Sequence, residues 1–465
     1  MRPPARRRIP LPYSPRGFIV ESSAQIDERR LISKITWRIV PFVMVLYTIA
    51  YIDRSVLGFA KTQMSAEVGL SDAAFGLGAG LFFLAYFLFE VPSNYILPKV
   101  GARKWFARIL FTWGLITALT ALTNSTGLFY LLRFLLGVAE AGFYPGVLFY
   151  LTFWFPQRHR TKATGTFVLA APIAFLVMGP LSGVVLELSW FGLQGWHWLF
   201  ILAGVVAMIA AVPTLLWLRD TPRSAPWMSD AEATWIETEL DKDRLLYGQE
   251  SHANPLRALR SKYVWVFALL FFPSTVGIYG LSFWLPTVIS AFSDSTAETG
   301  WLATIPYLFG VIGIFVTSRL AARMSENWIP LIVIYVGAAI GILLAAVAPP
   351  GPLQIASMSM AAFFLYAVAG VFWALPTRYL VGATAAVGIA FVNSFGNIGG
   401  FVGPYVVGAV SDATGNPVNG MFFLGAVLVL GAIGAAIGMR AWAGRNPVEA
   451  TPGVQPDGTR VDTSV

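Results

Sequence analysis

Apolar runs of about 20 residues recur along the whole chain, and they constrain its fold more than any other feature. A helix of that length crosses the hydrocarbon core of a bilayer, which is about 30 Å thick. Only 12% of the 465 residues are charged, whereas soluble proteins average about 25%. The sequence therefore predicts an all-α polytopic membrane protein.

We place twelve transmembrane helices in two bundles of six. The first six lie at about 37–60, 75–97, 105–123, 127–154, 161–187 and 197–218, and the second six at about 263–290, 298–320, 328–348, 352–376, 383–410 and 420–442. The predicted parts are a cytoplasmic tail (1–36), an N-terminal bundle (37–218), a central cytoplasmic loop (219–262), a C-terminal bundle (263–442) and a second cytoplasmic tail (443–465). Within the loop, Ser229 and Glu232 have the spacing of a capping box and predict a short helix that tethers the two halves.

Four glycines match at one offset between the two sets of spans. Gly76 corresponds to Gly300, and Gly179 corresponds to Gly403, each 224 residues later. Such matches indicate a duplicated architecture. Helices in lipid associate by close packing, so small residues in spans also predict places where two helices approach each other.

The basic residues are distributed unevenly. With the N-terminus inside, 28 of the 32 Lys and Arg residues fall in or beside segments assigned to the cytoplasmic side. This asymmetry follows the positive-inside rule and predicts a multi-pass inner-membrane protein with both termini in the cytoplasm. The net charge of +8 is then a sign of topology, and we expect no binding to nucleic acid.

Several chemistries are excluded or unsupported. Cysteine is absent, so disulfides and thiol chemistry are excluded. The three histidines are far apart and show no metal-ligand spacing. No nucleophile–base pair or phosphate-binding loop is evident. We therefore expect no metal, no cofactor and no enzyme activity.

Two spans carry charged residues at membrane depth. Arg133 and Glu140 lie in span four, and Asp53 and Arg54 lie in span one. Along a helix, Arg133 and Glu140 are about 10 Å apart and within about 20° of the same face. A charge at that depth costs at least ~2.5 kcal/mol, so it is usually turned inward and functional. The alternatives are a structural ion pair that locks two helices and a site for a charged solute.

Several stretches resemble the anion:cation symporter family of the major facilitator superfamily. They are RIVPFVMVLYTIAYIDRSVLGFA in span one, GLGAGLFFLAYFLFEVPSNYILPKVGARKW at span two, span four itself, WMSDAEATWIETEL in the central loop, GLSFWLPTVI in span seven and NSFGNIGGFVGPYVVG in span eleven. The resemblance covers about residues 30–442 and implies transport by alternating access. Members of this family include bacterial permeases for tartrate, phthalate, hydroxyphenylacetate and sugar acids.

The resemblance assigns roles to individual residues. It implies that Arg54 faces the cavity and binds the substrate carboxylate, and that the acidic residues Asp53 and Glu140 take part in proton coupling, beside Arg133. It also places Trp373 and Asn393 in the other half of the cavity. The loop after span two, NYILPKVGARK, lacks the usual acidic residue, and SRLAARMSEN after span eight is also degenerate. In this family these loops bear on gating and stability, so the departures concern how the protein changes conformation.

Helix geometry and charge suggest how these groups work together. Successive residues point about 100° apart, so Asp53 and Arg54 cannot both face one cavity. With Arg54 inward, Asp53 turns toward a neighbouring helix, where Arg133 would keep it ionised. Glu140 has fewer evident cationic neighbours in sequence, so burial favours its protonated form and makes it the expected proton carrier.

Further polar and aromatic residues are candidates for lining the cavity. They are Tyr47, Tyr51, Tyr86, Tyr279, Trp284, Trp373, Asn393 and Asn397. Asn393 and Asn397 share a helix face and can bind hydroxyl groups or a second carboxylate. Aromatic residues in spans also pack between helices, which is the alternative for each of them. Glu90 is interpreted as structural, bonding neighbouring helices near the gate.

The sequence thus predicts a monomeric, proton-coupled symporter that imports a small organic anion. The substrate would be a hydroxy- or dicarboxylate, such as tartrate or a sugar acid, or an aromatic acid. Its expected partners are this carboxylate, protons and the lipid bilayer. An organic-anion exchanger or uncoupled facilitator on the same scaffold is the alternative. A sensor would need an additional signalling domain, and the short tail at 443–465 offers little room for one.

Overall fold

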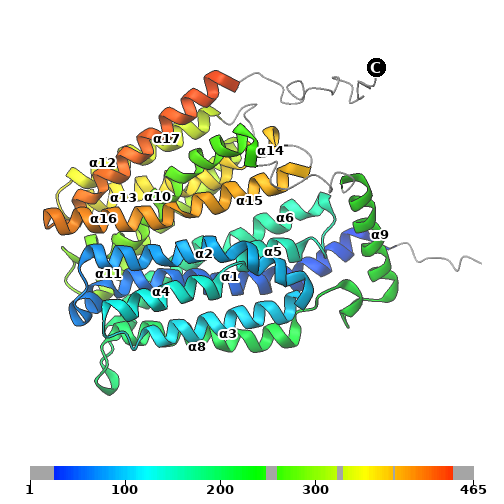
Figure 1. Cartoon of the computed structure of the whole chain (residues 1–465), viewed down its shortest axis with the longest axis horizontal. Coiled ribbons are helices and arrows are strands. Elements are labelled where there is room, and N and C mark those ends of the chain that lie inside the picture. The colour runs from blue at the N-terminus through cyan, green and yellow to red at the C-terminus, as the bar shows by residue number, and fades with distance from the viewer. Residues whose placement is uncertain (1–25, 248–258, 322–327, 381–382, 443–465) are drawn as a thin grey trace, which may run out of the picture.

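The computed structural model describes residues 26–247, 259–321, 328–380 and 383–442. Within these ranges the regular structure is entirely helical, and no strand occurs (Figure 1). The predicted all-α fold is therefore confirmed.

The spans of the first half form in the predicted order. They are α1 (Glu28–Val68), α2 (Asp72–Val100), α3 (Ala102–Thr120), α4 with α5 (Thr126–Glu140 and Phe143–Leu151), α6 with α7 (Gln157–Val168 and Ala170–Leu186) and α8 (Gly195–Trp217). Helix α1 begins well before the predicted residue 37, because the Asp27 side chain caps it by accepting from the Arg30 amide at 3.2 Å. It ends at Gly69, whose φ of 76° is left-handed.

The second half repeats this pattern. Its spans are α10 (Lys262–Ser290), α11 (Thr296–Ala321), α12 (Trp328–Val347), α13 (Pro352–Phe372), α15 with α16 (Ala383–Asn397 and Gly399–Thr414) and α17 (Gly420–Trp442); the short α14 (Pro376–Tyr379) follows α13. Ten segments in the described ranges are long and apolar enough to cross a membrane. The other two of the expected twelve are the 19-residue α3 and the interrupted pair α15–α16.

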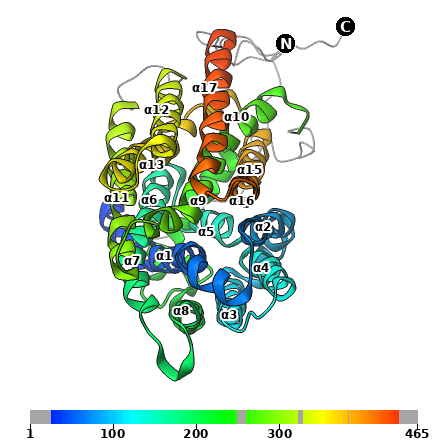
Figure 2. The same cartoon turned by 90° about the vertical axis from the view of Figure 1, so that its left-hand side faces the viewer.

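The two sets of helices form two groups, with α1 to α8 on one side and α10 to α17 on the other (Figure 2). They meet along α2 with α16 and along α7 with α11. Glycines permit these approaches. A Cβ on Gly76 would lie 2.9 Å from the Cα of Tyr405, and one on Gly300 would lie 3.0 Å from Gly183.

The two ends of the molecule differ. We call the end where α1 begins and α17 stops the tail end, and the opposite end the closed end. Helix α9 (Asp230–Tyr247) lies across the tail end, at the right of Figure 1. The seams between the bundles run from the closed end, where Gly183 meets Ala297, to the middle of α2. No comparable seam joins α5 or α6 to α13 or α14 among the described helices.

Helix α9 has the predicted capping box. The Ser229 amide donates to Glu232 at 2.8 Å, and the Glu232 amide donates to the Ser229 hydroxyl at 3.3 Å. The ion pairs of α9 go to the first half: Glu232 binds Lys34, and Glu239 binds Arg158. In the described part of the loop, these pairs fasten α9 to the N-terminal bundle, and its role as a tether between the halves stays a prediction.

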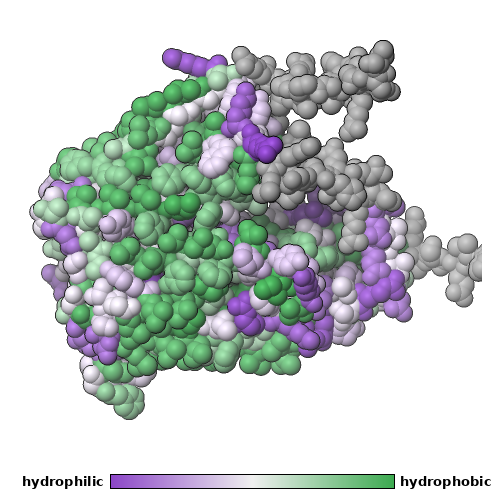
Figure 3. All heavy atoms as spheres, in the orientation of Figure 1, coloured by the Kyte–Doolittle hydropathy of each residue, from purple (hydrophilic) through white to green (hydrophobic). Residues whose placement is uncertain are grey.

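The surface fits a bilayer. Apolar side chains cover the middle of the face in Figure 3, and hydrophilic side chains gather toward its two ends. Large apolar residues of the described spans are exposed, including Val91 (73% exposed) and Val347 (67% exposed). Such a surface is stable only when hydrocarbon covers it.

Candidate substrate site

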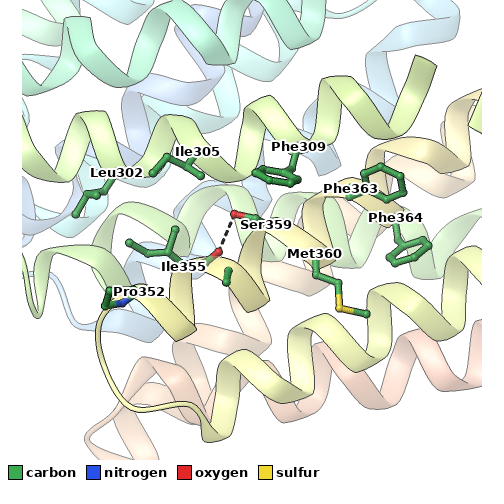
Figure 4. A pocket seen from close by; sticks show the side chains of 10 residues that line it. Leu302, Ile305, Phe309, Pro352, Ile355, Ser359, Met360, Phe363 and Phe364 are labelled. Carbon is green, nitrogen blue, oxygen red and sulfur yellow. Dashed lines mark hydrogen bonds between the residues drawn. The ribbon is translucent and has the colours of Figure 1, made fainter. Parts of the chain in front are cut away.

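Two hollows differ in their chemistry. The larger, of about 720 Å³, lies on α11 and α13 beside the exposed side chains of Ile305 and Phe309 (Figure 4). Its lining is apolar apart from Ser359, whose hydroxyl already donates to the Ile355 carbonyl at 2.7 Å. It contains no charge that could orient an ionic solute.

The other hollow, of about 180 Å³, lies between the bundles and contains Arg54. It is lined from both halves. Seven other predicted residues join Arg54 there: Tyr47, Tyr51, Tyr86, Tyr279, Trp373, Asn393 and Asn397. The structure therefore brings together eight of the nine residues predicted to bind substrate.

Arg54 does not stand free in this cavity. Its Nε and Nη2 donate to one carboxylate oxygen of Glu140, at 2.9 Å and 2.5 Å. The Arg54 side chain is 12% exposed and the Glu140 side chain only 1%. The guanidinium also lies 5.3 Å from the ring centroids of Tyr51, Phe82 and Tyr86. Glu140 thus has a cation in direct contact, although few cationic neighbours are evident for it in the sequence.

A break in the fourth span positions Glu140. Helix α4 ends at this residue, and α5 starts only at Phe143. Gly142 between them has a φ of 85°, a conformation that residues with a Cβ rarely adopt. The break ends α4 where its last side chain meets Arg54 on α1.

Asp53 and Arg133 are buried behind this pair, each 1% exposed. Asp53 interacts electrostatically with Arg133 and lies beside the Thr117 hydroxyl, but no ion pair joins Asp53 to Arg133 within the described ranges, and no guanidinium nitrogen of Arg133 has a hydrogen-bond partner there. The Arg133 guanidinium lies over the ring of Phe82 at 5.2 Å, so this ring contacts both arginines. The expected neighbourhood of Asp53 and Arg133 is present, without a direct ion pair.

Together these four groups form a balanced set of two cations and two acids. In a medium of low dielectric, the charges of such a set depend strongly on one another. If one acid takes up a proton, the set gains a net positive charge. That charge would favour an anion in the adjoining cavity.

Ten of the 21 residues that line the cavity are aromatic. Tyr47 stacks on Tyr144 with centroids 5.3 Å apart and on Phe167 at 4.6 Å. Phe83 of the first half meets Tyr279 of the second half at 4.3 Å. Flat apolar faces of this kind suit a planar substrate.

Trp284 lies elsewhere. Its Nε1 donates to the Pro404 carbonyl at 3.3 Å, and its ring lies 4.5 Å from the ammonium of Lys61. It is 1% exposed and does not line the cavity with Arg54. We therefore correct its assignment: it packs between α1, α10 and α16.

Sequence reasoning missed several lining residues. They are Phe83, Tyr144, Phe175, Phe271, Ser274, Thr275 and Tyr366. Tyr144 had a usable signal, because it lies four residues after the acid Glu140 in the same predicted span. The phenylalanines had none, because aromatic residues make up 14% of the chain and occur in most spans.

Glu90 lies where its structural interpretation placed it, joining neighbouring helices. Its carboxylate accepts from the Ser394 hydroxyl at 2.9 Å, which connects α2 with α15. Glu90 is 5% exposed and makes no contact with Arg54 within ion-pair distance. No cluster of three potential metal-ligating side chains occurs in the described ranges.

Comparisons with known proteins extend over most of the chain. The sequence model of the Major Facilitator Superfamily matches residues 43–404. A quinolone resistance transporter of Acinetobacter baumannii is 48% identical over 408 residues, which cover 87% of this chain and 94% of that protein. A putative tartrate transporter of Agrobacterium vitis is 40% identical over 407 residues, covering 87% and 90%.

The fold also matches a crystal structure. A bacterial homologue of the human lysosomal transporter Spinster, in an inward-facing and unoccupied conformation, has a TM-score of 0.71 and 18% identity. The match covers 89% of this chain and 98% of that one. At this identity the likeness concerns the fold alone.

Proposed function

Because the chain belongs to the major facilitator superfamily, whose members are membrane transporters, we propose that it imports a small organic carboxylate together with protons. The proposal rests mainly on one observation: the guanidinium of Arg54, which lines the central cavity, donates two hydrogen bonds to the carboxylate of Glu140. A substrate carboxylate would make the same hydrogen bonds, since the planar fork of arginine suits carboxylates.

Protonation then couples to binding by competition. When Glu140 is ionised, it holds Arg54 and excludes a second carboxylate. When Glu140 is protonated, Arg54 keeps its charge and is free to bind the substrate. The anion and the proton therefore load together, and release of the proton returns Glu140 to Arg54. Asp53 and Arg133, buried next to this pair, contribute to the net charge of the four groups.

The cavity accommodates small substrates. Its volume is about 180 Å³, Arg54 is the cation among its described lining residues, and ten of those 21 residues are aromatic. Asn393 and Asn397 add amide groups for hydroxyls or a second carboxylate. The lining supports planar aromatic acids as well as compact hydroxy acids. The names of the relatives, for quinolone and for tartrate, include both kinds of molecule.

The test is uptake of labelled tartrate and labelled benzoate into proteoliposomes, with and without an inward proton gradient. The wild type should accumulate at least one of the two acids when the gradient is present. Glu140→Gln should lose accumulation driven by the gradient but retain exchange, because glutamine can neither release a proton nor repel the anion.

Glu90→Gln is the matched control. It neutralises another buried carboxyl in the same half of the protein, one bound to Ser394 rather than to Arg54. It should retain gradient-driven accumulation. If the wild type only equilibrates or exchanges the acids, and Glu140→Gln behaves alike, the proton-coupling proposal is rejected in favour of an exchanger or facilitator.

A further inference from the structure

A second polar pocket, of about 370 Å³, lies at the tail end on the N-terminal bundle. Helices α1, α5 and α8 and the segment that leads to α9 form it. Its lining includes Arg38, Phe42, Tyr150, Trp154, Arg219 and Trp227. It shares no residue with the central cavity.

The pocket carries two cations without a protein anion. In the described part of the chain, neither Arg38 nor Arg219 forms an ion pair, and the Arg38 guanidinium lies 5.6 Å from the centroid of the Trp227 ring. The nearby acids have other partners. Asp220 accepts from the Arg103 amide at 2.9 Å, and Glu232 binds Lys34. The pocket is therefore suited to an anion.

Its walls are held in place. Trp154 is fully buried and stacks on Trp227, with centroids 5.6 Å apart and planes 20° apart. The Tyr150 hydroxyl donates to the backbone carbonyl of Arg219 at 2.8 Å. These contacts fix the loop that carries Arg219 before any ligand arrives, which lowers the entropy cost of binding.

The position of the pocket indicates the source of the anion. It lies where α8 ends at Trp217, whose ring is 70% exposed, and beside Trp37 on α1, which is 77% exposed. Exposed tryptophans at helix ends mark the boundary between hydrocarbon and headgroups. Just beyond, Phe42 packs edge-on against Trp217 at 6.2 Å, and Leu216 is 60% exposed. An apolar surface thus continues from the charged pocket into the membrane.

From these observations we propose that the pocket binds the phosphate group of an anionic phospholipid. Arg38 and Arg219 bind the phosphate, Trp227 forms the wall beside it, and the acyl chains lie along Phe42 and Leu216. Basic pockets between transmembrane helices at the cytoplasmic side are suited to such headgroups. This site is independent of the proposed transport function.

The test counts bound lipid on the full-length protein. The protein is purified in detergent, freed of copurified lipid and titrated with phosphatidylglycerol, and the bound lipids are counted by native mass spectrometry. The wild type should retain one tightly held phosphatidylglycerol. Arg38→Gln combined with Arg219→Gln should weaken this binding at least tenfold, whereas the corresponding lysine pair should keep most of it.

Arg30→Gln combined with Arg223→Gln is the matched control. It removes the same charge at the same end, from exposed arginines that pair with Asp27 and Glu237 outside the pocket. It should bind the lipid as the wild type does. If the glutamine pair fails to fold, Arg38→Gln alone replaces it, because its loss breaks no ion pair.

Three results would overturn the proposal. One is equal retention of phosphatidylglycerol by the wild type and the pocket variant. Another is equally tight binding of phosphatidylcholine with the same acyl chains, which would indicate general lipid adhesion. The third is displacement of the bound phosphatidylglycerol by inorganic phosphate at the same concentration, which would assign the site to a free anion.

Discussion

Arg54 and Glu140 are both charged and largely buried, and each offsets the loss of hydration of the other. A buried ion costs several kcal/mol unless a partner offsets the loss of water. Two hydrogen bonds from the guanidinium to one carboxylate oxygen provide that partner here. The second carboxylate oxygen of Glu140 has none. The pair is therefore stable yet incompletely satisfied, which suits a group that must exchange partners during transport.

Gly137 shows how far packing depends on one missing side chain. It lies on α4 where α2 approaches, and a Cβ there would meet the carbonyl of Phe82 and lie 2.8 Å from the Cβ of Ala85. We predict that Gly137→Ala destabilises the protein by about 1–3 kcal/mol through overpacking. Thermal unfolding in detergent should show a lowered Tm.

Gly127 on the same helix is the control for this prediction. A Cβ there would meet nothing within 4 Å. Gly127→Ala should leave the Tm unchanged or raise it slightly, because alanine favours a helix over glycine by about 0.5–1 kcal/mol. Equal losses in both variants would show that α4 tolerates no substitution and that the approach to α2 is not the cause.

At the level of elements, the closed end is held by contacts between the start of α2 and the end of α16. The carboxylate of Asp412 accepts from the amides of Asp72 and Ala73, both at 2.9 Å. Ser411 donates to the Asp72 side chain, which also pairs with Lys61 at 2.7 Å. An acid from one bundle thus caps a helix of the other, where the helix dipole favours negative charge.

We predict that Asp412→Asn shifts the protein toward opening at this end. Asparagine keeps one acceptor oxygen but loses the second acceptor and the negative charge, and a lost hydrogen bond costs about 1 kcal/mol, which changes an equilibrium about fivefold. Spin labels on Ala66→Cys in α1 and on Ala291→Cys, the residue directly after α10, would report the distance across the closed end, since both positions are exposed. A population with a longer distance should grow in the variant.

Ser125→Ala is the matched control at the same end. Ser125 caps α4 through the Leu128 amide at 3.4 Å, and it does so within one bundle. It should not change the distance distribution. If Asp412→Asn leaves the distances unaltered, the cap does not hold the bundles together.

Helix α9 depends on ionised carboxylates. Partial burial raises the pKa of Glu232, but hydrogen bonds from Lys34 and Ser229 outweigh this effect and hold the pKa below its ordinary value of 4.5. A carboxyl with a lowered pKa stabilises the folded state above pH 4.5, and its contribution is lost as the pH falls through the lowered value.

We therefore predict that α9 loosens from α1 in acid. Hydrogen exchange of amides in 230–247, corrected for intrinsic rates, should be slow at pH 7 and faster below about pH 4. Glu232→Gln should exchange faster already at pH 7 and show a smaller further change. Exchange that is independent of pH in the wild type would contradict a role for this carboxylate.

At the scale of the whole molecule, two bundles meet along two seams, and the cavity that contains Arg54 lies between them. The described helices of the two bundles contact each other at the closed end and midway along α2. The position of the cavity follows from this arrangement, because it needs side chains from both bundles.

The positive-inside distribution predicts that the tail end faces the cytoplasm. The chain has no cysteine, so each introduced cysteine is a unique thiol. Ala66→Cys near the closed end should react with a membrane-impermeant maleimide in intact cells. Lys104→Cys near the tail end should react only after permeabilisation. The reverse pattern would invert the topology and the direction of transport.

The sequence by itself determined the order of the spans, the buried charges and eight of the 21 residues that line the cavity. The bilayer is the reason, because it demands an apolar helix from each segment separately, and a charge inside such a segment is conspicuous wherever its neighbours lie. Local patterns also sufficed for the capping box of α9 and for the glycines at the seams.

Only the tertiary structure decided which of these groups touch. It paired Glu140 with Arg54 rather than leaving it without a cation, kept Asp53 and Arg133 near each other without an ion pair, and placed Trp284 away from the cavity. These outcomes depend on how far each helix is rotated about its axis. That rotation results from many weak packing contacts between helices distant in sequence, and no single span encodes it.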